Sequence, residues 1–335
     1  MANDQLTGFP QPLGAPPRFE QPEPPRESSV PPQRQPRIWL HFVLFGLTVL
    51  SMQVTAMSFW GEAPKGYTIV SYAAYQALSL IGILLVHELG HYVAARLHHV
   101  PASPPYFIPL PFIGLFGTLG AVITMNDRIR SRKALLDIGA AGPIAGMIVA
   151  LPVLFWGLKL SELTPRSTGH YMQEGQSILY WLMKRLVFGH IGPDQDVQLH
   201  PMALGGWGGL LLTMINLLPW GQLDGGHIAF ALFGENQHRI ARWFRRGLLV
   251  VFGYNVVMFV VPVLLHRSSQ PLPAALVTAA FWLVWYGITG LMARVSGEDH
   301  PPFEPAPLGL ARQLVAVGCL VLFVLLFLPT PLATY

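Results

Sequence analysis

Residues 72–97 form an apolar run long enough to cross a lipid bilayer as a helix, yet the run contains His87, Glu88 and His91. Arg96, close to its end, is the only other charged residue. At 100° per residue, His87 and His91 lie on one helix face a turn apart, so both imidazoles can reach one ion. Without partners, these polar side chains would cost several kcal/mol in hydrocarbon. The run therefore predicts a membrane helix that carries a metal site.

The spacing His-Glu-x-x-His supplies two metal ligands and, in Glu88, a carboxylate that reaches the open side of the ion. A chance match on a surface helix is the alternative for such a motif, and the apolar flanks argue against it. Catalytic zinc usually keeps three protein ligands and one exchangeable water, so a third ligand must come from elsewhere. Cys319 is the only cysteine, which excludes a thiolate zinc site and an intrachain disulfide.

Asp224 is the best candidate for the third ligand. It follows Pro219 and Gly221, which interrupt a helix, and precedes Gly225 and Gly226, so the chain can turn its carboxylate toward the two histidines. Capping of a broken helix end is the alternative role for this carboxylate. The predicted ligands of one Zn²⁺ ion per chain are His87, His91 and Asp224.

Four further polar residues have expected roles. Glu88 is predicted to take the proton of the attacking water and to deliver it to the leaving amine. Asn216, two turns before Asp224, can donate its amide to an oxyanion, with an interhelical hydrogen bond as the alternative. We expect His227 to support the ligands rather than to bind the metal. We expect Asp137 to form a cap or a salt bridge at the membrane edge rather than to bind substrate.

The composition places these residues in a polytopic membrane protein. The 335 residues are 52% hydrophobic and 11% charged, against about 25% charged in ordinary soluble domains. The net charge of +4 is small, and the basic residues lie between the apolar runs rather than on one patch. We therefore expect the lipid bilayer as a partner, and no nucleic acid.

The apolar runs predict an all-α fold with about seven transmembrane helices. Beside residues 72–97, the runs are 38–60, 134–158, 202–220, 247–265, 273–292 and 310–328. If these helices alternate in direction, 15 of the 21 Lys and Arg residues fall on the side of the N-terminal tail. The N-terminus is therefore expected in the cytoplasm, and the two polar segments are expected to converge in the cytoplasmic half of the membrane.

Residues 100–125 are the exception to this helical pattern. Five prolines and three glycines forbid a regular helix there, although the stretch is too apolar for an ordinary loop in water. Non-helical backbone at membrane depth must pair its amides within protein or line a wet cavity. We expect a short membrane-embedded segment, of β type, between the second and third helices. A loop that lies flat in the headgroups is the alternative.

Three motifs together resemble the site-2 protease family of intramembrane zinc metalloproteases. They are HELGH (87–91), AGPIAG (141–146) and N-x-x-P-x-x-x-LDGG (216–226). The resemblance covers about residues 70–295 and looks closest to the bacterial members without a PDZ domain and their chloroplast relatives. It implies His87, His91 and Asp224 as zinc ligands, Glu88 as base and Asn216 as a residue that orients substrate. Leu217 departs from the proline that the family commonly has at this position.

The family hydrolyses peptide bonds within or near the transmembrane helices of single-pass proteins, such as membrane-anchored transcriptional regulators. By this resemblance we expect regulated intramembrane proteolysis in a bacterial inner membrane. Two alternatives remain. A metal transporter should show paired broken helices in corresponding halves, and only residues 216–226 have that form. A non-catalytic receptor with the same fold would not need Glu88.

The chain is expected to divide into three parts. Residues 1–36 are rich in Pro, Gln and Glu and should form a disordered cytoplasmic tail. Residues 37–294 should form the intramembrane metalloprotease domain, and 295–335 a linker and a C-terminal transmembrane helix. Within the domain, residues 159–200 read as a polar loop with one amphipathic stretch, and His170, His190 and His200 read as ordinary loop histidines.

A helical substrate must become extended before it is cut, because its carbonyl groups are hydrogen-bonded and shielded within the helix. An extended segment in lipid would leave amides unpaired, so the enzyme should offer a strand edge to pair them. Residues 117–124 (GTLGAVIT) follow the HELGH helix and cannot be helical along their length. We expect them to present this edge beside the zinc.

Overall fold

The computed structural model describes residues 37–112, 116–125, 129, 131–166, 171–296 and 307–334. The chain divides after Pro36, and the unit described below is Arg37–Tyr335. The predicted tail lies outside the described residues, as do His170 and parts of both the predicted non-helical segment and the linker after residue 295.

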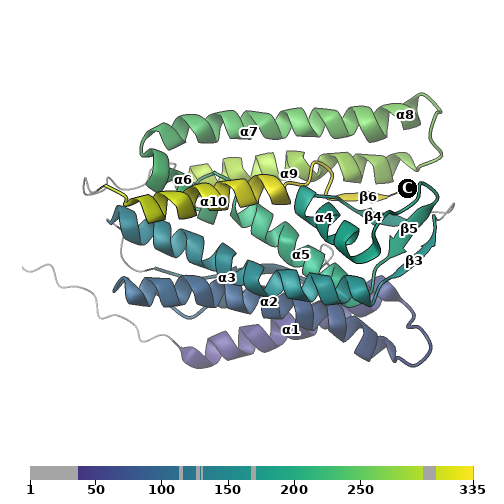
Figure 1. Ribbon diagram of the computed structural model, residues 1–335, viewed down its shortest axis with the longest axis horizontal. Coiled ribbons are helices and arrows are strands. Elements are labelled where there is room, and N and C mark those ends of the chain that lie inside the picture. The colour runs from purple at the N-terminus through teal and green to yellow at the C-terminus, as the bar shows by residue number, and fades with distance from the viewer. Residues whose placement is uncertain are drawn as a thin grey trace, which may run out of the picture. The chain divides into compact units, whose positions relative to one another are not determined.

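Three long helices open the described chain. They are α1 (Ile38–Trp60), α2 (Ile69–Leu97) and α3 (Arg132–Lys159). Helix α2 begins three residues earlier than the apolar run, because Thr68 and Ser71 form a reciprocal capping box that satisfies its first amides. Ser131 caps α3 in a similar way, and Pro143 and Pro152 both lie inside that helix. Helix α2 packs against both α1 and α3 (Figure 1).

The helix in the predicted span 202–220 ends four residues early. Helix α5 (Pro201–Asn216) ends before Pro219, and a separate helix α6 (Asp224–Phe233) begins after a turn in which Gly221 has φ of +52°. With 16 residues, α5 is about 24 Å long, which is shorter than the roughly 30 Å hydrocarbon core. Helices α2 and α3 both pack against α5.

The predicted span 247–265 is the second part of a longer helix. Helix α7 (Asn236–Asn255) continues through a π-helical stretch, η1 (Val256–Val260), into α8 (Val261–Leu264). The first turns of α7 contain basic residues, so a search for apolar runs leaves them out. Helix α9 (Leu272–Ser296) packs against α7, and α10 (Leu310–Leu326) follows (Figure 1).

The described residues are mostly helical, in agreement with the predicted class of a multi-pass membrane protein. Five of the described helical segments are long and apolar enough to cross a membrane, against about seven predicted. They are α1, α2, α3, the α7–η1–α8 segment and α9, whereas α10 is a shorter apolar helix.

Residues 106–122 contain a two-stranded antiparallel sheet. Strand β1 (Tyr106–Pro109) pairs with β2 (Thr118–Val122), with Phe107 opposite Ala121 and an irregularity between Phe107 and Pro109. The described backbone is thus non-helical in this stretch, as the prolines and glycines predicted. Its depth in the membrane stays a prediction.

The predicted polar loop 159–200 instead contains regular structure. Strand β3 (Glu162–Pro165) pairs with β5 (Gln195–Gln198), and the predicted amphipathic stretch forms α4 (Ile178–Phe188) between them in sequence. Strand β4 (Met172–Glu174) pairs with β6 (Leu332–Thr334), which comes from the other end of the chain. A pairing partner so distant in sequence explains why local patterns did not predict β4 and β6.

The segment after α10 connects several elements. The Pro329 carbonyl accepts hydrogen bonds from Asn255 Nδ2 of α7 at 2.9 Å and from Trp282 Nε1 of α9 at 2.8 Å. The Leu328 amide donates to the sulfur of Met214 in α5. Residues 328–334 therefore join the α7–α9 pair to α5 and to the small sheets.

Candidate metal centre

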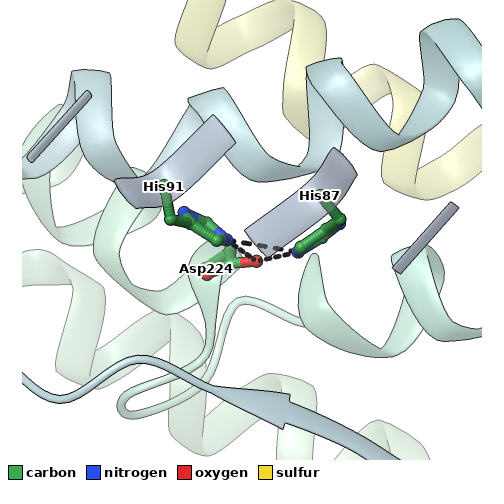
Figure 2. A group of neighbouring side chains, drawn as sticks. All are labelled: His87, His91 and Asp224. Carbon is green, nitrogen blue, oxygen red and sulfur yellow. Dashed lines mark hydrogen bonds and ion pairs between the residues drawn. The ribbon is translucent and has the colours of Figure 1, made fainter. Parts of the chain in front are cut away.

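Three potential ligand atoms meet where α2 passes the start of α6 (Figure 2). His87 Nε2 and His91 Nε2 each lie 3.2 Å from Asp224 Oδ2 and 3.2 Å from one another. This is the one group in the described part of the chain in which at least three metal-binding side chains converge in this way. The two histidines are a helical turn apart on α2, as their spacing predicted.

Asp224 reaches this position because the chain reverses after α5. Asp224 is the first residue of α6, and its carboxylate is directed at the histidines rather than at a helix cap. A Cβ added at Gly225 would overlap the Leu217 carbonyl, and one at Gly226 would overlap that of Gly221. The two glycines therefore allow the turn to fold tightly against α6.

A backbone contact orients His91. Its Nδ1 lies 2.7 Å from the Ile138 carbonyl of α3, and a carbonyl can only accept, so Nδ1 carries the proton. The lone pair of a neutral imidazole is then on Nε2, the atom that faces His87 and Asp224. This tautomer is the one that a metal ligand requires.

Glycines of α3 lie directly against the two imidazoles. A Cβ added at Gly142 would overlap His91 Nε2, and one at Gly146 would come within 3.1 Å of His87 Nδ1. The sequence predicted close helix contact from these small residues but not that the contact is with the two candidate ligand rings. Their helical spacing is the signal that could have indicated it, because Gly142 and Gly146 are four residues apart and share one face.

A cavity of about 310 Å³ opens beside the three ligand atoms. Glu88 lines it, is 6% exposed, and has no hydrogen-bond partner among the described residues. Asn216 lines it too, with Nδ2 at 3.1 Å from His87 Nε2. Ala121 and Val122 of β2 also line it. Both predicted catalytic residues and the predicted strand are thus at the same cavity as the ligands.

The other singled-out residues lie outside the ligand group. His227 is at the cavity wall, and Asp137 is paired with Arg312 of α10 at 2.8 Å and with His98 at 2.8 Å. This is the salt bridge expected for Asp137. His200 accepts the Met202 amide at the start of α5 and is 7% exposed, so it is a buried capping residue rather than a loop histidine.

Two imidazole nitrogens and one carboxylate oxygen, beside a cavity with room for water and substrate, are a donor set that fits catalytic zinc. A free carboxylate next to such ligands defines the class of site found in zinc-dependent peptidases. Peptidase family M50 matches residues 75–260, more than half of the chain, and the chain belongs to this family, the site-2 proteases.

Two curated relatives carry names of the same kind. "Probable zinc metalloprotease EGY1, chloroplastic" of Arabidopsis thaliana is 36% identical over 176 residues, which cover 51% of this chain and 31% of that protein. "Probable zinc metalloprotease EGY2, chloroplastic" of Oryza sativa subsp. indica is 35% identical over 167 residues, 48% of this chain and 29% of that protein. The chain thus spans about a third of the length of these relatives, and the matches confirm the predicted family.

Proposed function

We propose that this chain is an intramembrane zinc metalloprotease that cuts single-pass membrane proteins, such as membrane-anchored transcriptional regulators, within or near their transmembrane helices. The observation that carries the proposal is the convergence of His87, His91 and Asp224 at a cavity that Glu88 also lines. Membership of Peptidase family M50 and the printed names of the relatives support the zinc-dependent peptidase activity.

In this proposal the three ligands hold one zinc ion per chain. Zinc bound there would supply a Lewis acid for the scissile carbonyl and would make a nearby water a better nucleophile. Glu88 is the residue that moves the proton, first away from the attacking water and then to the leaving amine. Its burial and its lack of a hydrogen-bond partner leave the carboxylate available for that transfer.

Asn216 has a separate task. Its amide nitrogen lies beside His87 Nε2, at the edge of the same cavity. An N–H group at that place can orient the substrate carbonyl and stabilise the oxyanion that develops on it. The hydrogen bond with His87 keeps the alternative open that Asn216 mainly joins α5 to α2.

Strand β2 is proposed to hold the substrate in an extended form. It pairs with β1 on one edge, and Ala121, Val122 and Ile123 border the cavity. A substrate strand added to the other edge would satisfy amides that are costly in lipid. Successive N–H groups of a strand point to opposite edges. One of Ala121→Pro and Val122→Pro should therefore impair cleavage with zinc retained, whereas the other should weaken the β1–β2 pair.

The location of the chain completes the proposal. Residues 37–294 form the protease domain in a membrane, residues 295–335 a linker and a C-terminal helix, and the N-terminal tail lies in the cytoplasm, as the distribution of Lys and Arg favours. Only the resemblance to bacterial members supports a bacterial inner membrane as the location, since the named relatives are chloroplastic. The bilayer and a membrane-anchored substrate are the proposed partners.

Two substitutions test the chemistry. Purified Asp224→Ala should lose both zinc and cleavage of a membrane-anchored test substrate, whereas Asp137→Ala, the same change outside the ligand group, should keep its zinc. Glu88→Gln should keep zinc and lose about 100-fold or more in rate, because proton transfer is removed while the ligands stay. Undiminished cleavage by Glu88→Gln would sink the mechanism. Zinc transport into vesicles without any cleavage would favour the transporter instead.

A further inference from the structure

Helix α1 carries four buried polar side chains along its length. His41, Thr48, Ser51 and Thr55 are each 7% exposed or less. Buried polar groups in a membrane helix are costly unless they have partners, so their partners indicate what they are for. This helix precedes residues 75–260, which the family profile matches, and none of its side chains is a metal ligand.

Three of these side chains contact the backbone around the β1–β2 hairpin. His41 Nδ1 lies 3.2 Å from the Pro105 carbonyl, just before β1. Thr55 Oγ1 accepts the Phe112 amide at 3.2 Å, in the connection between the strands. Ser51 Oγ donates to the Gly117 carbonyl at 2.6 Å, just before β2. The three contacts thus hold the entrance of β1, the connection and the start of β2.

The contact at Gly117 is close as well as polar. Gly117 has φ of +72°, a conformation that favours glycine. A Cβ added there would lie 2.6 Å from Thr55 Oγ1 and 2.7 Å from the Ser51 carbonyl. Nothing larger than glycine can occupy this position, so the start of β2 is pressed directly onto α1.

Helix α1 is in turn fixed to the helix that carries the histidines. Trp60 Nε1 donates to Gln76 Oε1 at 2.7 Å, and Gln53 Nε2 donates to the Val70 carbonyl at 2.8 Å. Contacts therefore connect α2 to α1, and α1 to Gly117, the residue directly before β2. Four residues after Gly117, β2 reaches the cavity at Ala121.

The register of β2 determines which of its backbone groups and side chains face the metal centre. A strand advances about 3.3 Å per residue, and a slip of one residue turns every side chain to the opposite face. An added substrate strand would inherit any slip of β2, and a different peptide bond would then lie beside the metal centre. The Ser51 and Thr55 contacts act on the segment next to β2 and so can prevent such a slip.

We propose that Ser51 and Thr55 are positioning residues that hold β2 in register with the metal centre and thereby select which peptide bond of the substrate is cut. The inference rests on the proposed function and on strand addition at β2. It assigns to α1 a role in specificity, separate from the zinc chemistry of α2 and α6.

The test measures the accuracy of cleavage as well as its rate. Ser51→Ala and Thr55→Val would each be combined with a single-pass membrane substrate in vesicles, and the products would be weighed by mass spectrometry. We expect the rate at the main bond to fall about fivefold, the size that the loss of one buried hydrogen bond allows, and new cuts to appear one or two residues away. Zinc content should equal that of the parent, and Ser51→Thr, which keeps the hydroxyl, should restore the single cut.

Two matched variants of the same helix serve as controls. Thr48→Val removes a buried hydroxyl that has no partner among the described residues. Ser58→Ala removes an exposed hydroxyl that donates to the Val54 carbonyl within α1. Both should cut at the parental bond. Unchanged accuracy in Ser51→Ala, equal scatter in Thr48→Val, or loss of zinc in Ser51→Ala would overturn the inference. A parent that cuts no membrane substrate would instead refute the proposed function.

Discussion

Most glycines of the central helices α2, α3, α5 and α6 differ in their surroundings from those of the α7–α9 pair. The exceptions are Gly82 of α2, where an added Cβ would meet nothing within 4 Å, and Gly290 of α9, where it would overlap the Arg245 side chain. A Cβ added at Gly90 would lie 2.6 Å from the Ala141 carbonyl, and one at Gly206 would lie 2.8 Å from Leu154 Cα. At Gly247, Gly253 and Gly287, a Cβ would meet nothing within 4 Å. At Gly90 and Gly206, the missing side chain allows a neighbouring helix to come close. At the last three positions, the space beside the glycine stays open.

This difference indicates where the helices pack closely around the candidate metal centre. Lipid tails are as apolar as leucine, so helices in a membrane associate mainly through close packing and hydrogen bonds. The candidate ligands lie among such close contacts, between α2, α3 and α6. The α7–α9 pair contacts the ligand turn in another way, because the Arg245 guanidinium lies 5.6 Å from the Trp220 ring and 4.2 Å from the Tyr286 ring.

The largest effect is expected from Gly142→Ala. Its new methyl group would overlap His91 Nε2, so either the imidazole or α3 must move, and both displace a metal ligand. We expect zinc retained after dialysis to fall at least ~10-fold, the scale of changes made directly behind metal ligands. Metal analysis of the purified, folded protein measures it. Parental zinc content would mean that the two helices are not in contact at the centre.

A smaller effect is expected from Gly206→Ala, which places a methyl group against the α3 backbone at Leu154 but touches no ligand. Overpacking of this kind costs about 1–3 kcal/mol of unfolding free energy. The variant should unfold at lower temperature in detergent, while the folded fraction keeps its zinc. Loss of zinc by folded Gly206→Ala would mean that the packing of α5 also determines the geometry of the candidate metal centre.

The smallest effect is expected from Gly253→Ala on α7. The added methyl group has open space, and alanine favours a helix over glycine by about 1 kcal/mol. Unfolding temperature should therefore stay the same or rise slightly, with parental zinc content and activity. A drop comparable to that of Gly206→Ala would show that this face of α7 is packed, and the contrast between the two regions would fail.

The candidate centre could be predicted because its residues differ from those expected in an apolar membrane helix. His87, Glu88 and His91 are polar residues in an apolar helix, and Asp224 follows a proline and a glycine that must break one. Such conflicts can be recognised from neighbouring residues alone. The sequence for the same reason predicted the non-helical stretch that contains β1 and β2.

The remaining features depend on partners that are far away in sequence. Helix α5 is too short for a full span, and its glycines lie against distant neighbours: α2, α3 and, at Gly208, the Phe116 ring. Strand β4 needs β6, which lies about 160 residues later. The contact of Gly142 with His91 depends on the distance between two helices, which no local pattern contains.

The bonds around Pro329 have a consequence for the order of synthesis. Asp224, the last ligand, leaves the ribosome more than a hundred residues before the segment 328–334, which joins α7, α9 and α5. A growing chain therefore contains all three candidate ligands while the α7–α9 pair is still without this connection. The candidate metal centre is thus synthesised completely before the segment that ties the outer helices to α5.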